Sequence, residues 1–398
     1  MFVNGDGLKM AGERIWVTGM GIVSALGGSI AETEAAFVQD ALPPIRSPFA
    51  AYGIEVPVFM ASNTSTVGEE SRTVTLACRA AREALAAAGL ERLPDERRVG
   101  VCIGTTVASQ LNDIPFYENL RRTGVVDRSA VARYRKGNPA EALARAFGAA
   151  GPRLTVCNAC SSGADALGVA RSWLRAGLCD IVIAGGADEL SRLALCGFHA
   201  LGVYSAERCR PFDRDRTGLN LGEAAGILIL ETERHASARG VAALCELAGY
   251  GAANDAYHLT APRPDGEGLV RALVQALADV NAEPRHIAFV NAHGTATPDN
   301  DRVEGRTLAA FFGERLPVVS TKGWTGHTLG AAGAIEAIFT VMGLRAQRIP
   351  GTAGLATPAP DIPIRVSPEP QPTAGDCAAS TSLAFGGCNT ALVFRRVS

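Results

Sequence analysis

The feature that most constrains the fold of this chain is a weak internal repeat. Three pairs of segments match in the same order along the chain: GADALGVARSWLRAG (163–177) with GAIEAIFTVMGLRAQ (333–347), GEAAGILIL (222–230) with GGCNTALVF (386–394), and Trp16–Gly21 with Leu247–Gly251. The first pair has helical length and precedes an apolar strand, and the second pair has small residues followed by an apolar run. Matches in a common order indicate a duplicated fold rather than chance similarity.

Short runs rich in β-branched residues alternate with Ala- and Leu-rich stretches of helical length, which is typical of an α/β layered architecture. The expected strands are Ile15–Thr18, Val99–Gly104, Ile181–Gly185, Gly226–Glu231, Ile287–Ala292, Val318–Thr321 and Ala391–Arg395. The expected helices are Thr73–Ala88, Pro139–Phe147, Gly163–Ala176, Gly268–Val280, Asp301–Phe312 and Gly333–Arg345. The seam between the halves falls near residues 240–248, so we predict one half at 13–245 and the other at 246–398.

Composition excludes several classes of protein. The chain of 398 residues is 47% hydrophobic and 20% charged, as ordinary globular proteins are. A formal net charge of −2 makes nucleic acid an improbable partner. The amino end lacks a signal peptide, and no run approaches the roughly 18 apolar residues of a spanning helix. We therefore expect a cytoplasmic protein without a membrane span, whose ten scattered cysteines are reduced thiols.

The stretch LTVCNACSSGADALG (154–168) contains two cysteines, Cys157 and Cys160, for which three interpretations are available. A zinc site would need more ligands at recognisable spacing, and this CxxC has no second pair. A thioredoxin-like pair would present both sulfur atoms at a turn, whereas Cys157 ends an apolar segment like a strand entering the core. Burial of both cysteines as small hydrophobic residues is the simplest alternative.

Cys160 differs from Cys157 because it lies where the strand stops and a helix begins. Ser161, Ser162 and Gly163 supply small side chains and free amides in the first turn of that helix. The helix dipole contributes roughly 0.3–1 kcal/mol at such a position, less than the ~1.36 kcal/mol of one pKa unit. A reactive thiol at Cys160 therefore needs a nearby base.

Two of the six histidines have the context of an active site. His293 directly follows the expected strand in IAFVNAHGTATP, at the carboxyl end where open α/β sheets collect ligands. His327, in STKGWTGHTLGAAGAIEA, lies between a strand and a small-residue helix start, nearly where Cys160 lies in the first half. A duplicated fold would bring these turns together, so we predict a Cys-His-His site for covalent catalysis.

The other four histidines have ordinary contexts. We expect His199, His235 and His286 to have surface or packing roles, and His258 has either a loop hydrogen-bonding role or a catalytic one.

With these motifs in view, the chain resembles the β-ketoacyl-acyl carrier protein synthases, the elongating condensing enzymes of fatty acid and polyketide synthesis. The similarity rests on NACSSG, NAHGTATP, STKGWTGHTLGAAGA, CRPFDRDRTGLNLGEAAG, DAYHLTAPRPDGEG and FGGCN, and it runs from WVTGMGIVSALG to ALVF. The resemblance implies a thiolase-like, five-layered αβαβα duplicated core. It further implies a homodimer, or a heterodimer with a related ketosynthase or chain-length factor.

The resemblance also implies residue roles. Cys160 would take an acyl group from the phosphopantetheine of an acyl carrier protein, and His293 and His327 would support decarboxylative Claisen condensation with the malonyl thioester. No metal or further cofactor is implied. The remaining implied roles are an organising pair, Lys322 and Glu336, an oxyanion hole from the amides of Cys160 and Phe385, a gate at Phe385, and substrate contacts from Thr295, Thr297, Phe385 and Gly386.

The chain departs from the family pattern in three segments. TSLAFGGCN replaces a pattern close to NSFGFGGTN, so Leu383, Ala384 and Cys388 stand where Phe, Gly and Thr are usual. The segments GTTVASQ (104–110) and VVDRSAVARYRKGNPAEALARAF (125–147) are unusual for the acyl-pocket wall. Chain length and substrate type therefore do not follow from the resemblance.

Three other activities remain alternatives. A thiolase would use a second cysteine, for which Cys388 is available, but it would not carry NAHGT at His293. An inactive chain-length factor would lack the nucleophile. An acyltransferase that omits decarboxylation is the alternative that the sequence excludes least.

Overall fold

The computed structural model describes residues 12–38, 45–46, 54–61, 71–106, 114–129 and 137–397. The strands are β1 Ile15–Val23, β2 Ile45–Arg46, β3 Pro57–Val58, β4 Val99–Gly104, β5 Arg153–Val156, β6 Ile181–Asp188, β7 Ala224–Thr232, β8 Cys245–Asn254, β9 Ile287–Asn291, β10 Val318–Val319, β11 Arg348–Ile349, β12 Gln371–Pro372, β13 Cys377–Ala384 and β14 Cys388–Arg395. The α-helices are α1 Ile30–Val38, α2 Arg72–Ala87, α3 Ile114–Thr123, α5 Pro139–Phe147, α6 Ser162–Arg175, α7 Arg192–Ala200, α8 Glu233–Ala238, α9 Glu267–Asp279, α10 Pro298–Phe312, α11 Lys322–Thr325 and α12 Ala332–Ala346.

The main sheet consists of two five-stranded halves with the same topology. Its strand order is β10-β9-β13-β14-β8-β1-β7-β6-β4-β5, so the order outward from the centre is β1-β7-β6-β4-β5 on one side and β8-β14-β13-β9-β10 on the other. The halves meet where β1 pairs with β8 through Trp16–Glu246 and Val17–Cys245. The duplicated α/β core is therefore confirmed, whereas the boundary between residues 245 and 246 stays a prediction.

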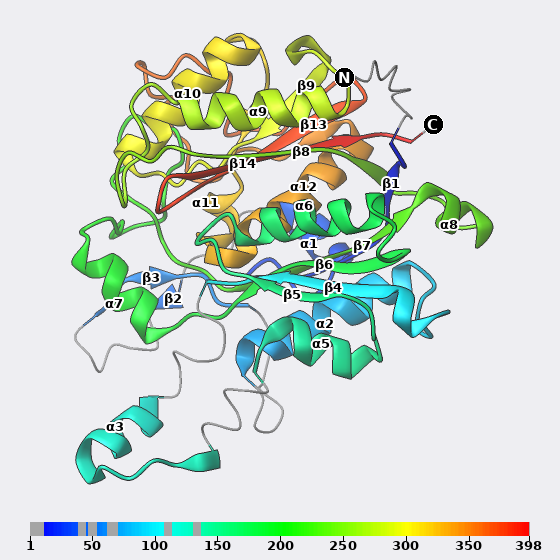
Figure 1. The fold of residues 1–398 in the computed structure, drawn as a ribbon. Coiled ribbons are helices and arrows are strands. Elements are labelled where there is room, and N and C mark those ends of the chain that lie inside the picture. Colours follow the sequence, from blue (N-terminus) through cyan, green and yellow to red (C-terminus); the bar gives the residue numbers. More distant parts are fainter. Residues whose placement is uncertain are drawn as a thin grey trace, which may run out of the picture.

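The elements form five layers (Figure 1). Helices α9 and α10 cover the outer face of the second-half strands, and α2 and α5 cover the outer face of the first-half strands. The contacting helices α6 and α12 fill the space between the two sets of strands. Strands β4, β6 and β7 are buried along their whole length, as expected for strands that helices cover on both sides.

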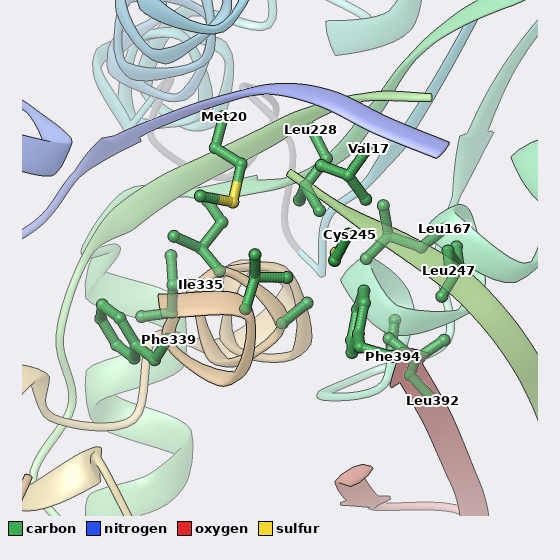
Figure 2. Close-up of a cluster of buried hydrophobic side chains, with 14 of the residues drawn as sticks. Val17, Met20, Leu167, Leu228, Cys245, Leu247, Ile335, Phe339, Leu392 and Phe394 are labelled. Carbon is green, nitrogen blue, oxygen red and sulfur yellow. The ribbon is translucent and has the colours of Figure 1, made fainter. Parts of the chain in front are cut away.

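Small residues let the two central helices approach closely. An added Cβ at Gly163 would lie 2.7 Å from Gly330 O, and one at Gly333 would lie 2.7 Å from Ala164 Cβ. The repeated Gly-Ala pair of the sequence is thus the point where α6 and α12 cross. Around this crossing, side chains from β1, β7, β8, β14 and the central helices form one buried apolar cluster (Figure 2).

The repeat extends to the packing of the outer helices. An added Cβ at Gly21 in β1 would lie 2.0 Å from Ala80 O in α2, and one at Gly251 in β8 would lie 2.0 Å from Ala272 O in α9. The similarity of Trp16–Gly21 and Leu247–Gly251 therefore reflects one strand-helix contact used twice.

Every expected element is present in the structure, with shifts at its ends, but the expected elements omit several others, among them two long strands of the main sheet. Helix α5 has the predicted bounds because Asn138 caps its first turn and Gly148, with φ of 74°, ends it in the left-handed region. Strands β8 and β13 were not among the expected strands. In β13 the sequence CAASTSLA has no long apolar run, yet neighbouring elements bury almost all of it.

Strand β5 corrects the expectation for Cys157. The strand lies at the edge of the sheet, Leu154 is 42% exposed, and Cys157 is exposed. Cys157 therefore does not follow a strand that enters the core. The ten cysteines, all within the described residues, form no disulfide with one another.

The expectation about apolar runs also needs correction. Residues Leu329–Ala346 are long and apolar enough to cross a membrane by composition, with a mean hydropathy of 1.4. However, 83% of this window is buried inside the protein, as in the central helix of a globular fold. The cytoplasmic location stays a prediction. Of the unusual segments noted above, residues 107–110 and 130–136 lie outside the described part of the chain.

We predict that Gly21→Ala lowers the free energy of unfolding by about 1–3 kcal/mol, because the new methyl group would overlap Ala80 O. Gly197 in α7 is the matched control, since an added Cβ there meets no heavy atom within 4 Å. Gly197→Ala should be neutral or stabilising by ~0.5–1 kcal/mol. Denaturant unfolding measures both variants, and equal midpoints would contradict the close approach.

Candidate active site

Cys160 lies in a tight turn between β5 and α6. The residue before it, Ala159, has φ of 46°, which is unusual for a residue with a side chain. This turn puts Cys160, which is 4% exposed, just before the first turn of α6. The Phe385 N–H lies near the Cys160 sulfur and lowers the pKa of its thiol. The sulfur thus has a backbone amide beside it at the positive end of a helix.

The second half contains the equivalent turn. When the chain is aligned on Gly163 and Gly333, Leu329 corresponds to Ala159 and has φ of 53°. In this alignment Gly330 corresponds to Cys160, and His327 corresponds to Cys157 rather than to Cys160. The Gly330 N–H donates to the carboxylate of Asp188 at 2.6 Å. An internal carboxylate therefore occupies the amide of the second turn.

The two turns bring His327 to Cys160. The His327 Nε2 lies 3.1 Å from the Cys160 Sγ, and both side chains are buried. His293 follows β9, and its ring lies 5.2 Å from the His327 ring, centroid to centroid, at an interplanar angle of 86°. The predicted Cys-His-His cluster is therefore assembled in space.

Both imidazoles are neutral and point Nε2–H toward the cluster. Burial lowers the pKa of both His293 and His327 well below the usual range, and the Lys322 charge lowers both further. His327 Nδ1 accepts the Leu329 N–H at 3.3 Å, and His293 Nδ1 accepts from Lys322 Nζ at 3.2 Å. A neutral ring whose Nδ1 is an acceptor carries its proton on Nε2. The site thus offers two N–H donors.

Lys322 and Glu336 lie behind the histidines. The Lys322 ammonium donates to the Glu336 carboxylate and, at 2.6 Å, to the His293 carbonyl oxygen. Burial raises the pKa of Glu336 to about 7, against the attraction of Lys322. Both side chains are fully buried, so this pair fixes the His293 ring rather than contacting solvent.

Burial also controls the pKa of the nucleophile, Cys160. It raises the pKa of the Cys160 thiol to about 12, whereas the Lys322 charge and the Phe385 N–H lower it. The resting thiol is therefore protonated at neutral pH.

A cavity of about 240 Å³ leads to this cluster. Cys160, His293 and His327 line it, and so do Thr295 and Thr297, whose hydroxyl oxygens lie 2.8 Å apart. Two hydroxyl groups near the histidines can hydrogen-bond a polar, flexible substrate arm.

Phe385 lines the same cavity and begins the three-residue turn between β13 and β14. Its ring stacks on Phe198 of α7, with centroids 5.4 Å apart and an interplanar angle of 15°. Gly386 does not line the cavity; it is exposed and its N–H donates to Leu259 O at 2.8 Å. Of the predicted site residues, Gly386, Lys322 and Glu336 thus lie outside the lining.

The sequence reasoning missed Glu304. Its carboxylate, buried beneath the site, accepts the N–H groups of His293 and Gly294, both at 2.7 Å, and the Thr381 hydroxyl. Glu304 lies four residues before Leu308, a buried apolar residue of α10, so both side chains lie on the same face of the helix. An acidic residue on the apolar face of a predicted helix was the signal that could have identified Glu304.

The remaining histidines lie outside the cluster. His258 Nδ1 accepts the Thr260 and Ala261 N–H groups, both at 3.1 Å, in agreement with a loop role. His235 contacts the Glu231 carboxylate at 2.7 Å. His199 and His286 are exposed.

The two cysteines of the CxxC motif have separate surroundings. The Cys157 thiol donates to Thr106 O at 3.5 Å, while Cys160 faces His327. Across the described ranges, no group of three His, Cys, Asp or Glu side chains is arranged to hold a metal ion. The zinc interpretation of the motif therefore has no support from the geometry.

Two family models match the chain in succession. "Beta-ketoacyl synthase, N-terminal domain" matches residues 57–236, and "Beta-ketoacyl synthase, C-terminal domain" matches residues 244–356. Among curated proteins, the chain is 40% identical over 260 residues to 3-oxoacyl-[acyl-carrier-protein] synthase 2 of Staphylococcus aureus strain COL. That alignment covers 63% of this chain and 63% of the relative, so it spans less than two thirds of the relative's length.

Solved structures match over nearly the whole chain. A β-ketoacyl synthase from Burkholderia phymatum STM815 is 32% identical with a TM-score of 0.90, and the ishigamide ketosynthase/chain length factor is 30% identical with a TM-score of 0.90. A type II polyketide acyl-carrier protein in complex with its ketosynthase matches at 28% identity and a TM-score of 0.89. Each match covers 97% of this chain and 100% of the other. With both family models and two full-length structural matches at or above 30% identity, the chain belongs to the β-ketoacyl synthase family.

Proposed function

We propose that this protein is a β-ketoacyl-acyl carrier protein synthase that joins a Cys160-bound acyl group to malonyl carrier protein with loss of carbon dioxide. The observation that carries the proposal is the buried contact of 3.1 Å between Cys160 Sγ and His327 Nε2, beside a second neutral imidazole at the end of an open cavity. The product would be a 3-oxoacyl thioester in fatty acid or polyketide synthesis.

In the loading step, Cys160 releases its thiol proton to water in the cavity, and the resulting thiolate attacks the acyl thioester carbonyl. The N–H groups of Cys160 and Phe385 stabilise the oxyanion, and its collapse expels the pantetheine sulfur, which takes up a proton. Burial opposes ionisation of Cys160, so the donors around the sulfur are needed to lower the barrier.

In the condensation step, the malonyl carboxylate leaves as carbon dioxide and its electron pair forms a thioester enolate. The Nε2–H groups of His293 and His327 donate to the enolate oxygen, and a donor of this kind commonly contributes about 10²–10³ in rate. The enolate carbon then attacks the acyl carbonyl, and the Cys160 thiolate departs. Neutral imidazoles suit this role because each ring accepts from the protein at Nδ1 and keeps its proton on Nε2 as a donor.

The supporting residues have positioning roles in this proposal. Lys322 and Glu336 hold the His293 ring with Nε2–H directed into the site. Thr295 and Thr297 bind the pantetheine arm, and Phe385 gates the acyl pocket. The Phe385 ring stacks on Phe198, which gives that gate a defined resting position.

Acyl transfer without decarboxylation is the main alternative. The second neutral imidazole favours condensation, because simple transfer needs no pair of donors at an enolate. A thiolase mechanism is disfavoured, since the Cys388 thiol donates to Asn158 Oδ1 at 3.0 Å and so faces a neighbouring amide. An inactive chain-length factor would not retain Cys160.

We propose an acyl carrier protein and a second ketosynthase-type subunit as partners, since related ketosynthases are found with both. The exposed edge of β5 and helix α3, which extends away from the body in Figure 1, are the surfaces for the second subunit. They carry the exposed side chains Leu154 and Tyr117, at 42% and 50%. An unpaired edge strand with apolar side chains favours pairing with another copy.

Leu154→Arg should convert the dimer to monomer, because it puts a charge on the edge strand. Val274→Arg is the control, since Val274 is 52% exposed on the outer helix α9. Sedimentation equilibrium measures both variants. A monomeric wild type, or an unchanged Leu154→Arg dimer, would refute this interface.

Cys160→Ala should abolish acyl loading from an acyl carrier protein, whereas Cys157→Ala should load at close to the wild-type rate. The reason is that Cys160 alone of the two faces His327. Intact mass after incubation with a panel of acyl carriers gives the readout and also identifies the preferred chain. Equal losses in both variants would overturn the assignment of the nucleophile.

His327→Ala should reduce carbon dioxide release from malonyl carrier protein by about 10²-fold or more, since one of two enolate donors is lost. Loading of Cys160 should fall less. Trapped carbon dioxide and intact mass report the two steps separately. Normal carbon dioxide release would remove the proposed role of His327, and a wild type that loads without releasing carbon dioxide would favour acyl transfer.

A further inference from the structure

The side chain of Asp165 lies beneath the nucleophile turn and has no role in the mechanism above. It belongs to the first turn of α6 and is 5% exposed. Its carboxylate accepts four hydrogen bonds, which arrive in two pairs on its two oxygens. Four hydrogen bonds and the helix N-terminus stabilise this buried group.

One oxygen of Asp165 holds both sides of the nucleophile turn. Its Oδ2 accepts from Asn158 Nδ2 at 2.6 Å and from the Ser161 hydroxyl at 2.7 Å. These residues flank Ala159 and Cys160, and Ala159 has a positive φ that a side chain disfavours. The pair of hydrogen bonds therefore stabilises a turn that the backbone alone would not adopt readily.

The other oxygen anchors this turn to the second half of the fold. Asp165 Oδ1 accepts from the Tyr250 hydroxyl in β8 at 3.0 Å and from the Thr390 hydroxyl in β14 at 2.6 Å. The carboxylate thus bridges the turn of Cys160 and two second-half strands, of which β14 follows the turn that contains Phe385. The position of the Cys160 sulfur relative to the Phe385 N–H is thereby fixed, because both pairs of hydrogen bonds are made to the same rigid carboxylate.

The orientation of the Asn158 amide is fixed from both ends. Its Nδ2 donates to Asp165, and its Oδ1 accepts from the Cys388 thiol at 3.0 Å. Cys388 lines the cavity and its sulfur in turn accepts from Asn254 Nδ2 at 3.3 Å. A chain of hydrogen bonds therefore connects the cavity wall with the turn of the nucleophile.

We infer that Asp165 is a positioning residue for acyl loading: its carboxylate sets the turn that carries Cys160 against the Phe385 amide. This inference rests on the proposed function, in which Cys160 takes the acyl group. The hydrogen bonds that hold the two histidines, Lys322 and Glu336 are made to other residues, so we expect decarboxylation not to depend on Asp165. Asp165 is thereby distinguished from a residue that merely supports the fold.

The test compares two steps in one variant. Asp165→Asn replaces an oxygen acceptor by an NH2 group that faces two donors, so the turn shifts. We expect the single-turnover rate of acyl-Cys160 formation to fall about 10- to 100-fold, as small misplacements of reacting groups do. Carbon dioxide release from malonyl carrier protein should stay within about twofold of wild type. Decarboxylation relies on the Nε2–H groups of His293 and His327, which Asp165 does not position.

Serine variants of the same helix supply a milder change and its control. Ser161→Ala removes one donor to Asp165 Oδ2 and should slow loading severalfold, while Ser172→Ala removes a hydroxyl that donates to the Gly168 carbonyl and should leave loading unchanged. If Asp165→Asn fails to fold, the two serine variants still decide the question. Equal losses of loading and carbon dioxide release, or unchanged loading in both Asp165→Asn and Ser161→Ala, would overturn the inference. A wild type that never loads would instead refute the proposed function.

Discussion

The close crossing of α6 and α12 assembles the active site from the two halves of the fold. Backbones approach this closely only where side chains are absent, and Gly163 and Gly333 provide that space from the two halves. The crossing brings the turn before each helix to the same point, so Cys160 and His327 come within hydrogen-bond distance although 167 positions separate them in the chain. A larger residue at either glycine would separate the sulfur from the imidazole before it affected either one directly.

Burial then determines the chemistry at that point. It raises the pKa of the Cys160 thiol and lowers the pKa of both histidines, so the resting cluster carries little charge of its own. The buried Lys322 ammonium, paired with Glu336, is the cation that both imidazoles and the sulfur experience. A site of this kind is suited to stabilising negative charge that develops on a substrate, because neutral donors and one fixed cation need little rearrangement when the charge appears.

The sequence predicted the cluster because each member follows an apolar strand and the halves repeat. It could not reveal whether a strand lies at the centre or the edge of a sheet, which depends on strand order, and so Cys157 was expected in the core and is exposed. It also missed β13, whose small polar residues are buried by their neighbours. Glu304 was missed because an acid within a helix usually faces solvent, whereas this one anchors the backbone of His293.

The duplicated turns are alike in backbone shape but not in what their amides bind. In the second half, the Gly330 N–H is already bound to the Asp188 carboxylate, so the protein supplies its own anion where the first half leaves room for one from a substrate. Asp188 also accepts from Thr105 and Thr106 and is buried, which makes it difficult to displace. The scaffold is therefore duplicated but its amide site is not: under the proposed function, each polypeptide carries one acyl group rather than two.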